Sequence, residues 1–258
     1  MEVNQNTPIE VYDVGTRPIH VLRGDLQGDG EILPPWGKLA AIENVLKNGD
    51  IDKSIPIIQL SVRGSYSGWA LGALAPKLGY QIQIAYPNAK NFPDQMIEKF
   101  KQYPVELVPM RPNMMSVVLG QTKKYARENN LQMIPYGFEH PLYLEWFENK
   151  IKEYDFDTLV VCAGTPVTSL GMIRGFTGKE IHCVATCKER TVLKQFEKYK
   201  INPEDVNIHV SPYDFYDEME DFTAPFACNR NWDIKVWKWI TENANHLNGN
   251  VLFWNLGA

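Results

Sequence analysis

The sequence predicts an α/β protein with two lobes, each a mostly parallel sheet flanked by helices. Two series of alternating strand and helix patterns carry this prediction, one over residues 55–135 and one over residues 157–210. Such alternation is typical of parallel strands whose connecting helices cover the sheet. Because two series occur in 258 residues, we expect residues 1–48 and 136–258 to form a large lobe and residues 49–135 a small inserted lobe.

The elements follow from short apolar runs, which indicate strands, and from apolar residues three and four positions apart, which indicate helices. In the small lobe, strands are expected at 55–61, 81–86, 105–110 and 132–135, and helices at 65–78, 93–103 and 113–129. In the large lobe, strands are expected at 19–26, 157–162, 181–186 and 206–210, and helices at 167–176 and 189–199. A final strand is expected in L-F-W-N-L-G-A at the end of the sequence.

Composition excludes several functional classes. The net charge of −5 gives no global attraction to nucleic acid, so nucleic acid is not an expected partner on this ground. No apolar run reaches membrane-spanning length and no signal peptide is recognisable, so we expect a cytoplasmic protein without a membrane partner. Cys162, Cys183, Cys187 and Cys228 are expected to be reduced thiols. His182 adjoins Cys183, but the spacing matches no common zinc pattern, so no metal is expected.

Lys38 is the predicted reactive residue. It follows the turn P-P-W-G and precedes an apolar helix in which Leu39, Ile42 and Val45 share one face. The prolines fix φ and the glycine permits a sharp turn, so the lysine lies where extended chain becomes helix. Burial beside that face would lower the pKa of the amine and allow it to form a Schiff base with a carbonyl cofactor. The alternative is an ordinary first-turn lysine whose ammonium reaches solvent.

Two strand-to-helix turns lie where parallel sheets bind their ligands. The turn S-V-R-G-S-Y-S-G-W offers backbone N–H groups and the hydroxyls of Ser65, Tyr66 and Ser67, a pattern typical of carboxylate binding. The turn C-A-G-T-P-V-T-S-L-G has small residues and two threonine hydroxyls before a helix, which favours a phosphate site. No G-x-G-x-x-G and no P-loop lysine is present, so a dinucleotide or ATP is not indicated. A helix-capping role explains each turn separately about as well.

A third junction, N-W-D-I-K-V-W-K-W-I, is expected to begin a helix. Trp232, Val236, Trp239 and Ile240 recur at helical spacing, which indicates a buried apolar face. Asp233 lies in the first turn, where a carboxylate interacts favourably with the helix dipole. The pattern leaves open whether Asp233 points into a ligand site.

Together these stretches resemble the pyridoxal-phosphate (PLP) enzymes of fold type II, the tryptophan synthase β-like fold. They resemble the branch that contains aminocyclopropane-carboxylate (ACC) deaminase and D-cysteine desulfhydrase. V-L-R-G-D-L resembles the Lys-Arg-Glu-Asp strand of the family, and G-K-L at Lys38 resembles its Asn-Lys-x-Arg loop. G-S-Y-S-G-W resembles Gln-Ser-Asn-x-x-Arg, C-A-G-T-P-V-T-S-L-G-M the phosphate loop, and W-D-I-K at Asp233 the segment Tyr-Glu-Gly-Lys. The chain is shorter than is usual for the family, and in this it resembles short, virus-like members.

The resemblance implies a role for each matched residue. Lys38 is the implied Schiff-base lysine of pyridoxal 5'-phosphate, Asp233 the implied partner of the pyridine nitrogen, and Ser65 the third implied catalytic residue, near the substrate Cα. The other implied cofactor contacts are Tyr66, Gly164, Thr165, Val167 and Thr168, and the implied substrate contacts are Ser65, Ser67 and Gly137. Pro166 replaces a usual glycine and removes one N–H donor. The usual arginine of the serine turn is Trp69 here.

The resemblance implies a homodimeric PLP enzyme that acts at the Cα or Cβ of a small-molecule amino acid or amine, as a deaminase or lyase. A protonated pyridine ring is the stronger electron sink for such chemistry. One alternative is a PLP-dependent decarboxylase of an amino acid carried on a larger molecule, such as a modified DNA base, which would make nucleic acid a partner. Another is a non-catalytic protein whose two lobes close on a small anion.

Overall fold

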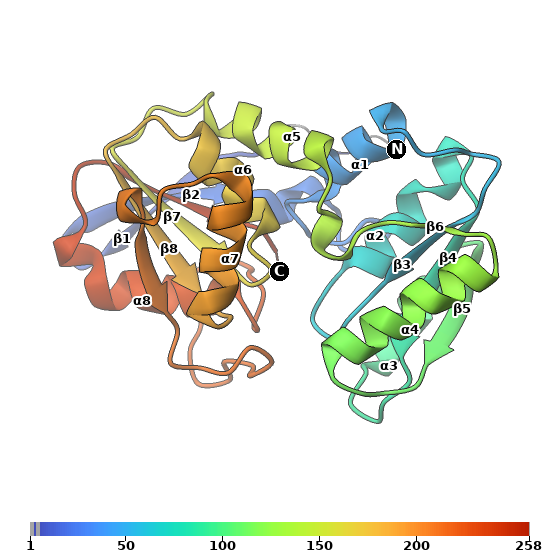
Figure 1. Ribbon diagram of the computed structural model, residues 1–258. Coiled ribbons are helices and arrows are strands. Elements are labelled where there is room, and N and C mark those ends of the chain that lie inside the picture. The colour runs from blue at the N-terminus through green and yellow to red at the C-terminus, as the bar shows by residue number, and fades with distance from the viewer. Residues whose placement is uncertain (1–2, 4–5, 258) are drawn as a thin grey trace. The chain divides into compact units, whose positions relative to one another are not determined.

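The computed structural model describes Val3 and residues 6–257, and it has two compact units (Figure 1). Unit 1 contains the residues up to Gly28, Pro35–Ala41 and the residues from Pro141 onwards. Unit 2 contains Asp29–Pro34 and Ile42–His140. The sequence placed the divisions after residues 48 and 135, whereas the units divide after residues 41 and 140, and a short segment before Pro35 also belongs to unit 2.

Unit 1 contains a six-stranded sheet in the order β1-β2-β10-β7-β8-β9. The strands are β1 (Ile9–Val14), β2 (Arg17–Arg23), β7 (Thr158–Ala163), β8 (Glu180–Ala185), β9 (Asn207–Val210) and β10 (Val251–Asn255). Among these described strands, only β1 is antiparallel to its neighbour, β2. The last strand of the chain lies between the second strand and β7, with Val251 opposite both Ile19 and Thr158. The carboxyl ends of five parallel strands therefore share one edge.

Helices cover both faces of this sheet, as the fully buried residues of β7 require (Figure 1). The helices are α5 (Pro141–Ile151), α6 (Val167–Gly175), α7 (Glu189–Tyr199) and α8 (Asp233–Asn243). Successive residues of β10 point to opposite faces of the sheet and pack against different helices. The ring of Phe253 lies 6.2 Å from Trp237 of α8, whereas the ring of Trp254 lies 5.4 Å from Phe147 of α5. This alternation is the two-residue period of a strand.

Two glycines let α6 approach α5 closely. A Cβ on Gly171 would lie 2.6 Å from the carbonyl oxygen of Leu144, and a Cβ on Gly175 would lie 2.1 Å from that of Glu148. Both distances are too short for a side chain, so only glycine permits this packing. The packing fixes the helix that follows the predicted phosphate loop.

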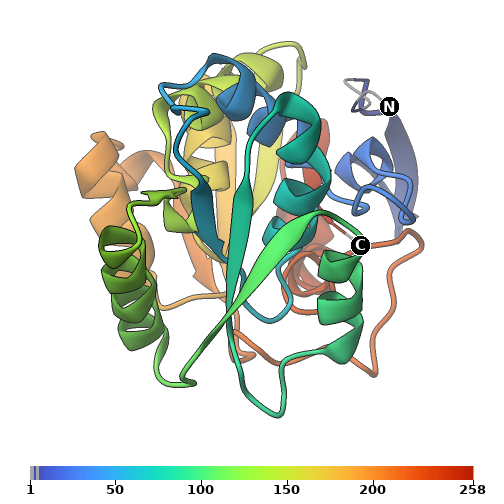
Figure 2. The same cartoon turned by 90° about the vertical axis from the view of Figure 1, so that its right-hand side faces the viewer.

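Unit 2 contains a four-stranded parallel sheet in the order β5-β4-β3-β6 (Figure 2). The strands are β3 (Ile57–Leu60), β4 (Ile82–Pro87), β5 (Val105–Met110) and β6 (Gln132–Met133). The helices are α1 (Leu39–Asn48), whose first residues belong to unit 1, α2 (Ser67–Leu74), α3 (Asp94–Lys101) and α4 (Met115–Glu128). Val118 of α4 packs with Ile58, Leu60 and Val108 in the core of this unit. The predicted fold class, two mostly parallel sheets flanked by helices, is confirmed.

Two elements of unit 1 have no counterpart among the sequence predictions. The edge strand β1 alternates exposed and half-buried residues, and Val11 is 55% exposed. Helix α5 begins at Pro141. The first position of a helix is the one that tolerates proline best. Its buried residues Leu144, Phe147 and Ile151 recur at helical spacing, so a signal was present in the sequence.

Candidate active site

The turn that carries Lys38 is fixed to the end of β10. The Gly37 N–H donates to the carbonyl oxygen of Leu256 (2.6 Å), and Trp36 forms an isolated β-bridge with Gly257. The Lys38 ammonium lies over the ring of Trp36, with 5.0 Å between the nitrogen and the ring centroid. The lysine turn is thus held by backbone contacts to a strand more than 200 residues later in the chain.

Asp233 lies buried at the same edge of the sheet. It is the first residue of α8, is only 3% exposed, and its Oδ1 accepts a hydrogen bond from the Leu256 N–H (3.1 Å). Burial raises the pKa of Asp233 to about 7, against the opposing effects of this hydrogen bond and of Lys38. The carboxyl therefore points into the protein, which the sequence left open.

Lys38 and Asp233 interact electrostatically within unit 1. Part of the Lys38 side chain is accessible, but burial of the amine lowers its pKa, and Asp233 partly opposes this shift. Burial thus favours the neutral form of both groups, while their mutual attraction favours the ion pair. The Cys162 thiol near the end of β7 interacts electrostatically with both groups, and burial raises its pKa. The structure brings together the two residues to which the resemblance gives the central chemical roles.

The predicted phosphate loop joins β7 to α6. Thr165 is partly exposed and Val167 is buried at the start of α6, where no side chain of the described residues caps the helix N-terminus. The hydroxyl of Thr168 lies 2.8 Å from that of Tyr143 in α5, and both residues are buried. The Thr168 hydroxyl therefore already has a partner, whereas the backbone N–H groups of the first turn form the polar end of the helix.

Two buried polar atoms next to Gly164 lack hydrogen-bond partners among the residues that the structure describes. They are Oγ1 of Thr186, which follows β8, and Nε1 of Trp232, which precedes α8. A Cβ on Gly164 would lie 3.5 Å from Thr186 Oγ1, 3.6 Å from Trp232 Cδ1 and 3.6 Å from Phe215 Cε2. Unpaired buried polar groups cost free energy unless a ligand or water completes them. These two donors and the α6 N-terminus fit an anionic group with several acceptor oxygens.

A buried lysine that the sequence analysis passed over lies in the first turns of α8. Lys235 is 2% exposed, and its Nζ donates to the carbonyl oxygen of Asp214 (2.6 Å). Burial lowers the pKa of Lys235. Asn231 Nδ2 likewise donates to the carbonyl oxygen of Tyr216 (3.1 Å). The start of α8 therefore holds the loop after β9 by two side-chain contacts to its backbone.

The serine turn belongs to unit 2 and lies between β3 and α2. Ser65 Oγ accepts from the Ser67 N–H (3.2 Å), and the ring of Tyr66 meets that of Trp69 edge-on at 5.8 Å. The Trp69 Nε1–H donates to the carbonyl oxygen of Ile32 (3.1 Å). Where the resembled family has an arginine, this chain thus has an indole that packs inside unit 2. Ser65, Tyr66 and Ser67 keep their predicted roles as predictions.

Gly137 also lies in unit 2, in a short 3-10 helix (Tyr136–Phe138), with φ of 74°. This left-handed conformation favours glycine. Its predicted contact with substrate stays a prediction.

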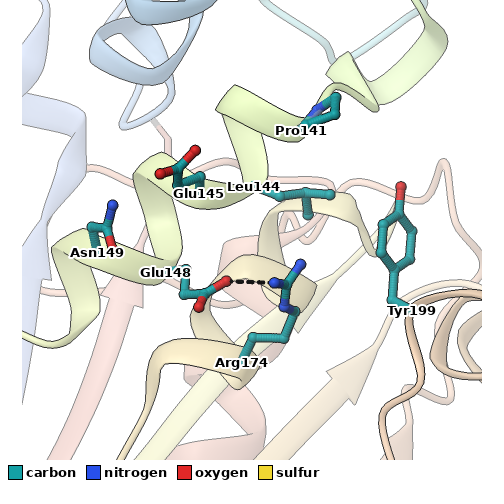
Figure 3. Close-up of a pocket in the computed structure, with 7 residues that line it drawn as sticks. All are labelled: Pro141, Leu144, Glu145, Glu148, Asn149, Arg174 and Tyr199. Carbon is teal, nitrogen blue, oxygen red and sulfur yellow. Dashed lines mark ion pairs between the residues drawn. The ribbon is translucent and has the colours of Figure 1, made fainter.

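A separate cavity of about 380 Å³ lies on the α5, α6 and α7 side of unit 1 (Figure 3). Its lining includes the ion pair between Arg174 and Glu148 (2.8 Å), together with Glu145 and Tyr199. Arg174 is in the last turn of α6, whereas the predicted phosphate loop precedes the first turn. No residue predicted for the active site lines this cavity, whose lining residues are all described ones.

Comparisons with known proteins identify the class of fold. No family model matches the sequence. The chain is 25% identical over 279 residues to the glycyl-dTMP PLP-dependent decarboxylase of Pseudomonas phage M6, over 98% of each chain. Among solved structures, it is similar to an ACC deaminase homologue (TM-score 0.75, 16% identity, 99% of this chain and 90% of that one). It is also similar to the O-acetylserine-dependent cystathionine beta-synthase of Helicobacter pylori (TM-score 0.72, 14% identity, 98% and 92%).

The cysteine synthase of Entamoeba histolytica has a similar structure as well (TM-score 0.70, 16% identity, 97% of this chain and 85% of that one). The fold of this chain is therefore that of the fold type II PLP enzymes. The predicted tryptophan synthase β-like fold is confirmed.

Proposed function

We propose that this chain is a PLP-dependent decarboxylase that acts on an amino acid joined to a thymine nucleotide. One observation carries the proposal: the similarity to the phage glycyl-dTMP decarboxylase runs over 98% of both chains. The chain is thus a PLP-dependent enzyme, as the sequence predicted. Of the reactions that the sequence left open, the decarboxylation of a carried amino acid is the one that this relative favours.

The residues of unit 1 fit the cofactor. Lys38 offers a buried amine, and Asp233 a buried carboxyl for the pyridine nitrogen. Thr186 Oγ1 and Trp232 Nε1 have no hydrogen-bond partner in the described part of the chain and lie beside Gly164, where they suit the phosphate together with the first turn of α6. When bound, PLP supplies an electron sink for the negative charge that forms at the substrate Cα.

Each residue has a task in this proposal. Lys38 Nζ anchors the cofactor, and burial favours the unprotonated amine that this bond needs. In decarboxylation the bond between Cα and the carboxylate breaks, carbon dioxide leaves, and a proton takes its place. Lys38 Nζ is the amine we expect to deliver that proton. As a carboxylate, Asp233 would keep a proton on the pyridine nitrogen by direct ion pairing, and the charge of that ring would in turn favour the ionised carboxyl over the neutral form that burial favours.

The residues expected to contact the substrate belong to unit 2. Ser65 and Ser67 lie at the start of α2, where backbone N–H groups suit a carboxylate. We expect them, with Gly137, to orient the amino-acid group, and Tyr66 to contact the cofactor. A homodimer remains the expected assembly. Among the described residues no helix is long and apolar enough to span a membrane.

A second candidate is deamination or elimination, since the fold resembles that of an ACC deaminase homologue. One experiment separates the candidates. The purified protein, loaded with PLP, is mixed with a thymidine nucleotide that carries glycine labelled with ¹³C at the carboxyl, either free or within a DNA oligonucleotide. Release of labelled carbon dioxide with retention of the amine supports decarboxylation. Release of ammonia would instead establish deamination, and the two substrate forms show which size the enzyme accepts.

A further inference from the structure

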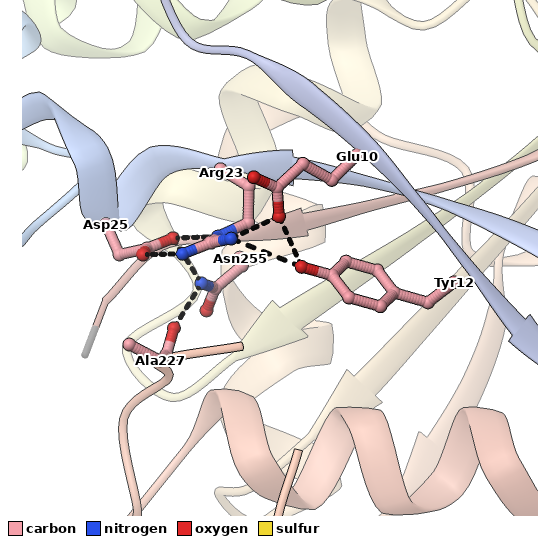
Figure 4. Close-up of polar contacts among 6 residues, drawn as sticks. All are labelled: Glu10, Tyr12, Arg23, Asp25, Ala227 and Asn255. Carbon is pink, nitrogen blue, oxygen red and sulfur yellow. Dashed lines mark hydrogen bonds and ion pairs between the residues drawn. The ribbon is translucent and has the colours of Figure 1, made fainter. Parts of the chain in front are cut away.

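A buried ion pair lies at the carboxyl end of β2 (Figure 4). Arg23 Nε donates to Asp25 Oδ1 (2.9 Å), and Arg23 Nη2 donates to Asp25 Oδ2 (2.7 Å). Glu10 and the hydroxyl of Tyr12 contact the remaining Arg23 nitrogen. Arg23 is 9% and Asp25 1% exposed, so the pair is retained in the interior by its bidentate geometry and these added contacts.

Asn255 joins this ion pair to the end of β10 (Figure 4). Its Nδ2 donates both to Asp25 Oδ1 (2.7 Å) and to the carbonyl oxygen of Ala227 (2.8 Å). Because a carboxylate and a carbonyl only accept, these two partners determine which end of the amide faces them. Asn255 has no exposed surface. Its side chain therefore fixes the end of β10 to the Arg23–Asp25 pair.

The next residue, Leu256, contacts both parts of the candidate active site. Its N–H donates to Asp233 Oδ1 (3.1 Å), and its carbonyl oxygen accepts from the Gly37 N–H (2.6 Å), directly before Lys38. The backbone of one residue thus sets where the Asp233 carboxyl and the lysine turn lie. Leu256 can do so only if the end of β10 is itself held in place.

We propose that Asn255 is a positioning residue that fixes the Leu256 backbone against Asp233 and the Lys38 turn. The proposal deepens the proposed function and rests on it, because that function gives Lys38 and Asp233 their chemistry. Hydrogen bonds weaken steeply as their angle departs from linearity. A strand end that had lost its Asn255 contacts would therefore donate less well to Asp233.

The network formed by Arg23, Asp25, Asn255 and the Leu256 backbone shifts the pKa of Asp233 in two opposite directions. The charged or titratable groups that face Asp233 are Lys38, Asp25, Cys162 and Cys228. The Leu256 hydrogen bond lowers the pKa of Asp233, whereas the charge of Asp25 raises it. Asn255→Ala should weaken the hydrogen bond and raise this pKa further. Asp25→Asn removes the charge but leaves an acceptor oxygen for the Asn255 amide, so it should lower the pKa.

The test is an infrared titration of the carboxyl C=O band in cofactor-free protein, with the Asp233 band assigned by its loss in Asp233→Asn. We expect the midpoint to rise by about half a pH unit or more in Asn255→Ala and to fall in Asp25→Asn. The matched control is Asn248→Ala, since Asn248 Nδ2 donates to Glu180 Oε2 (2.9 Å) before β10 begins. A midpoint in Asn255→Ala equal to that of the control, or shifts of the same sign in both network variants, would overturn the proposal.

A measurement on the unmodified protein keeps the proposal testable if a variant does not fold. After correction for the intrinsic pH dependence, the Leu256 amide should exchange its hydrogen more slowly above the Asp233 midpoint than below it, because a carboxylate is the stronger acceptor. Equal protection on both sides would contradict the proposal. Neither measurement needs the cofactor. A protein that fails to bind PLP would therefore refute the proposed function without deciding the role of Asn255.

Discussion

Gly24 and Gly37 lie with their backbones in direct contact. A Cβ on Gly24 would lie 2.9 Å from Gly37 Cα and 2.5 Å from the carbonyl oxygen of Asn255, and a Cβ on Gly37 would lie 2.8 Å from Gly24 Cα. Real side chains do not approach backbone atoms so closely. The lysine turn can therefore rest on the end of β2 only because both residues are glycine.

Gly24→Ala should destabilise the protein by about 1–3 kcal/mol, because the added methyl would meet backbone atoms, which cannot move aside without straining the fold. The free energy of unfolding in urea measures this. Gly120→Ala is the matched control, since Gly120 lies within α4 and a Cβ there would meet no atom within 4 Å. That change should stabilise the protein by about 0.5–1 kcal/mol, because alanine is the better helix former. Equal effects at the two positions would show that the contact is not tight.

Lys38→Ala should abolish the absorption band at about 410–430 nm that PLP gives when bound to a lysine, while the protein stays folded. Borohydride reduction of the loaded wild type, followed by peptide mass spectrometry, should place the cofactor on Lys38. Lys47→Ala serves as control, since Lys47 lies on α1 with half of its side chain exposed, in an ion pair with Glu43. A tag on Lys235, the other buried lysine noted in unit 1, would move the reactive amine there.

Thr186→Val should weaken PLP binding and at the same time stabilise the cofactor-free protein. The change removes a buried hydroxyl that has no partner among the described residues but keeps the shape of the side chain. Removing such a group relieves a desolvation cost of about 1–3 kcal/mol, whereas a lost hydrogen bond to a charged phosphate costs about 1.5–3 kcal/mol. Cofactor titration and urea unfolding measure the two effects.

The control for this prediction is Thr122→Val. Thr122 is equally buried, but its hydroxyl donates to the carbonyl oxygen of Val118 (3.0 Å), so its loss should not stabilise the protein. If Thr186→Val binds PLP as tightly as the wild type, the phosphate does not lie beside Gly164. The double variant of Thr165 and Thr168 would then be the next test, although the Thr168 hydroxyl already pairs with Tyr143.

Asp233 should make the cofactor-free protein less stable as pH rises from about 4 to 7. Its pKa is raised from 3.8 to about 7 in the folded state, so over this range the unfolded carboxyl releases a proton that the folded one retains. The loss should be on the order of 2–4 kcal/mol. In Asp233→Asn this component is absent, so the variant should gain stability relative to the wild type with rising pH. Urea unfolding at several pH values measures the difference.

The pKa of Asp157 is shifted in the opposite direction to that of Asp233, so its effect on stability has the opposite pH dependence. Lys179 and the Asn250 N–H hold the pKa of this surface carboxyl below its usual value, so its contribution is present at neutral pH and is lost as pH falls. Asp157→Asn should therefore lose stability relative to the wild type at neutral pH and not at low pH. If Asp233→Asn showed the same sign, the Asp233 carboxyl would be ionised in the folded protein.

Asp233→Asn should also retain PLP yet slow decarboxylation by orders of magnitude, because an amide does not hold a proton at the pyridine nitrogen as a carboxyl does. Single-turnover release of labelled carbon dioxide measures the chemical step separately from binding. A rate equal to that of the wild type would leave Asp233 with a structural role at the start of α8.

The sequence by itself determined the alternating strands and helices of both units and the loops in which Lys38, Gly164 and Asp233 lie. These features follow from local causes, namely hydrophobic periodicity, turn residues and the tendency of ligand-binding loops to follow parallel strands. It did not reveal β1, whose edge position leaves its apolar pattern weak. It also missed α5, although the helical spacing was present.

Only the tertiary structure decided which backbone and polar atoms meet at these loops. Leu256 reaches Asp233 and Gly37 because β10 inserts between β2 and β7. No local pattern encodes this placement, which pairs β10 with a strand more than 200 positions earlier in the chain. The position of the Thr186 hydroxyl next to Gly164 depends in the same way on the placement of β8 beside β7. Periodicity specifies which face of a strand is buried, whereas the order of strands is set by packing over the whole unit.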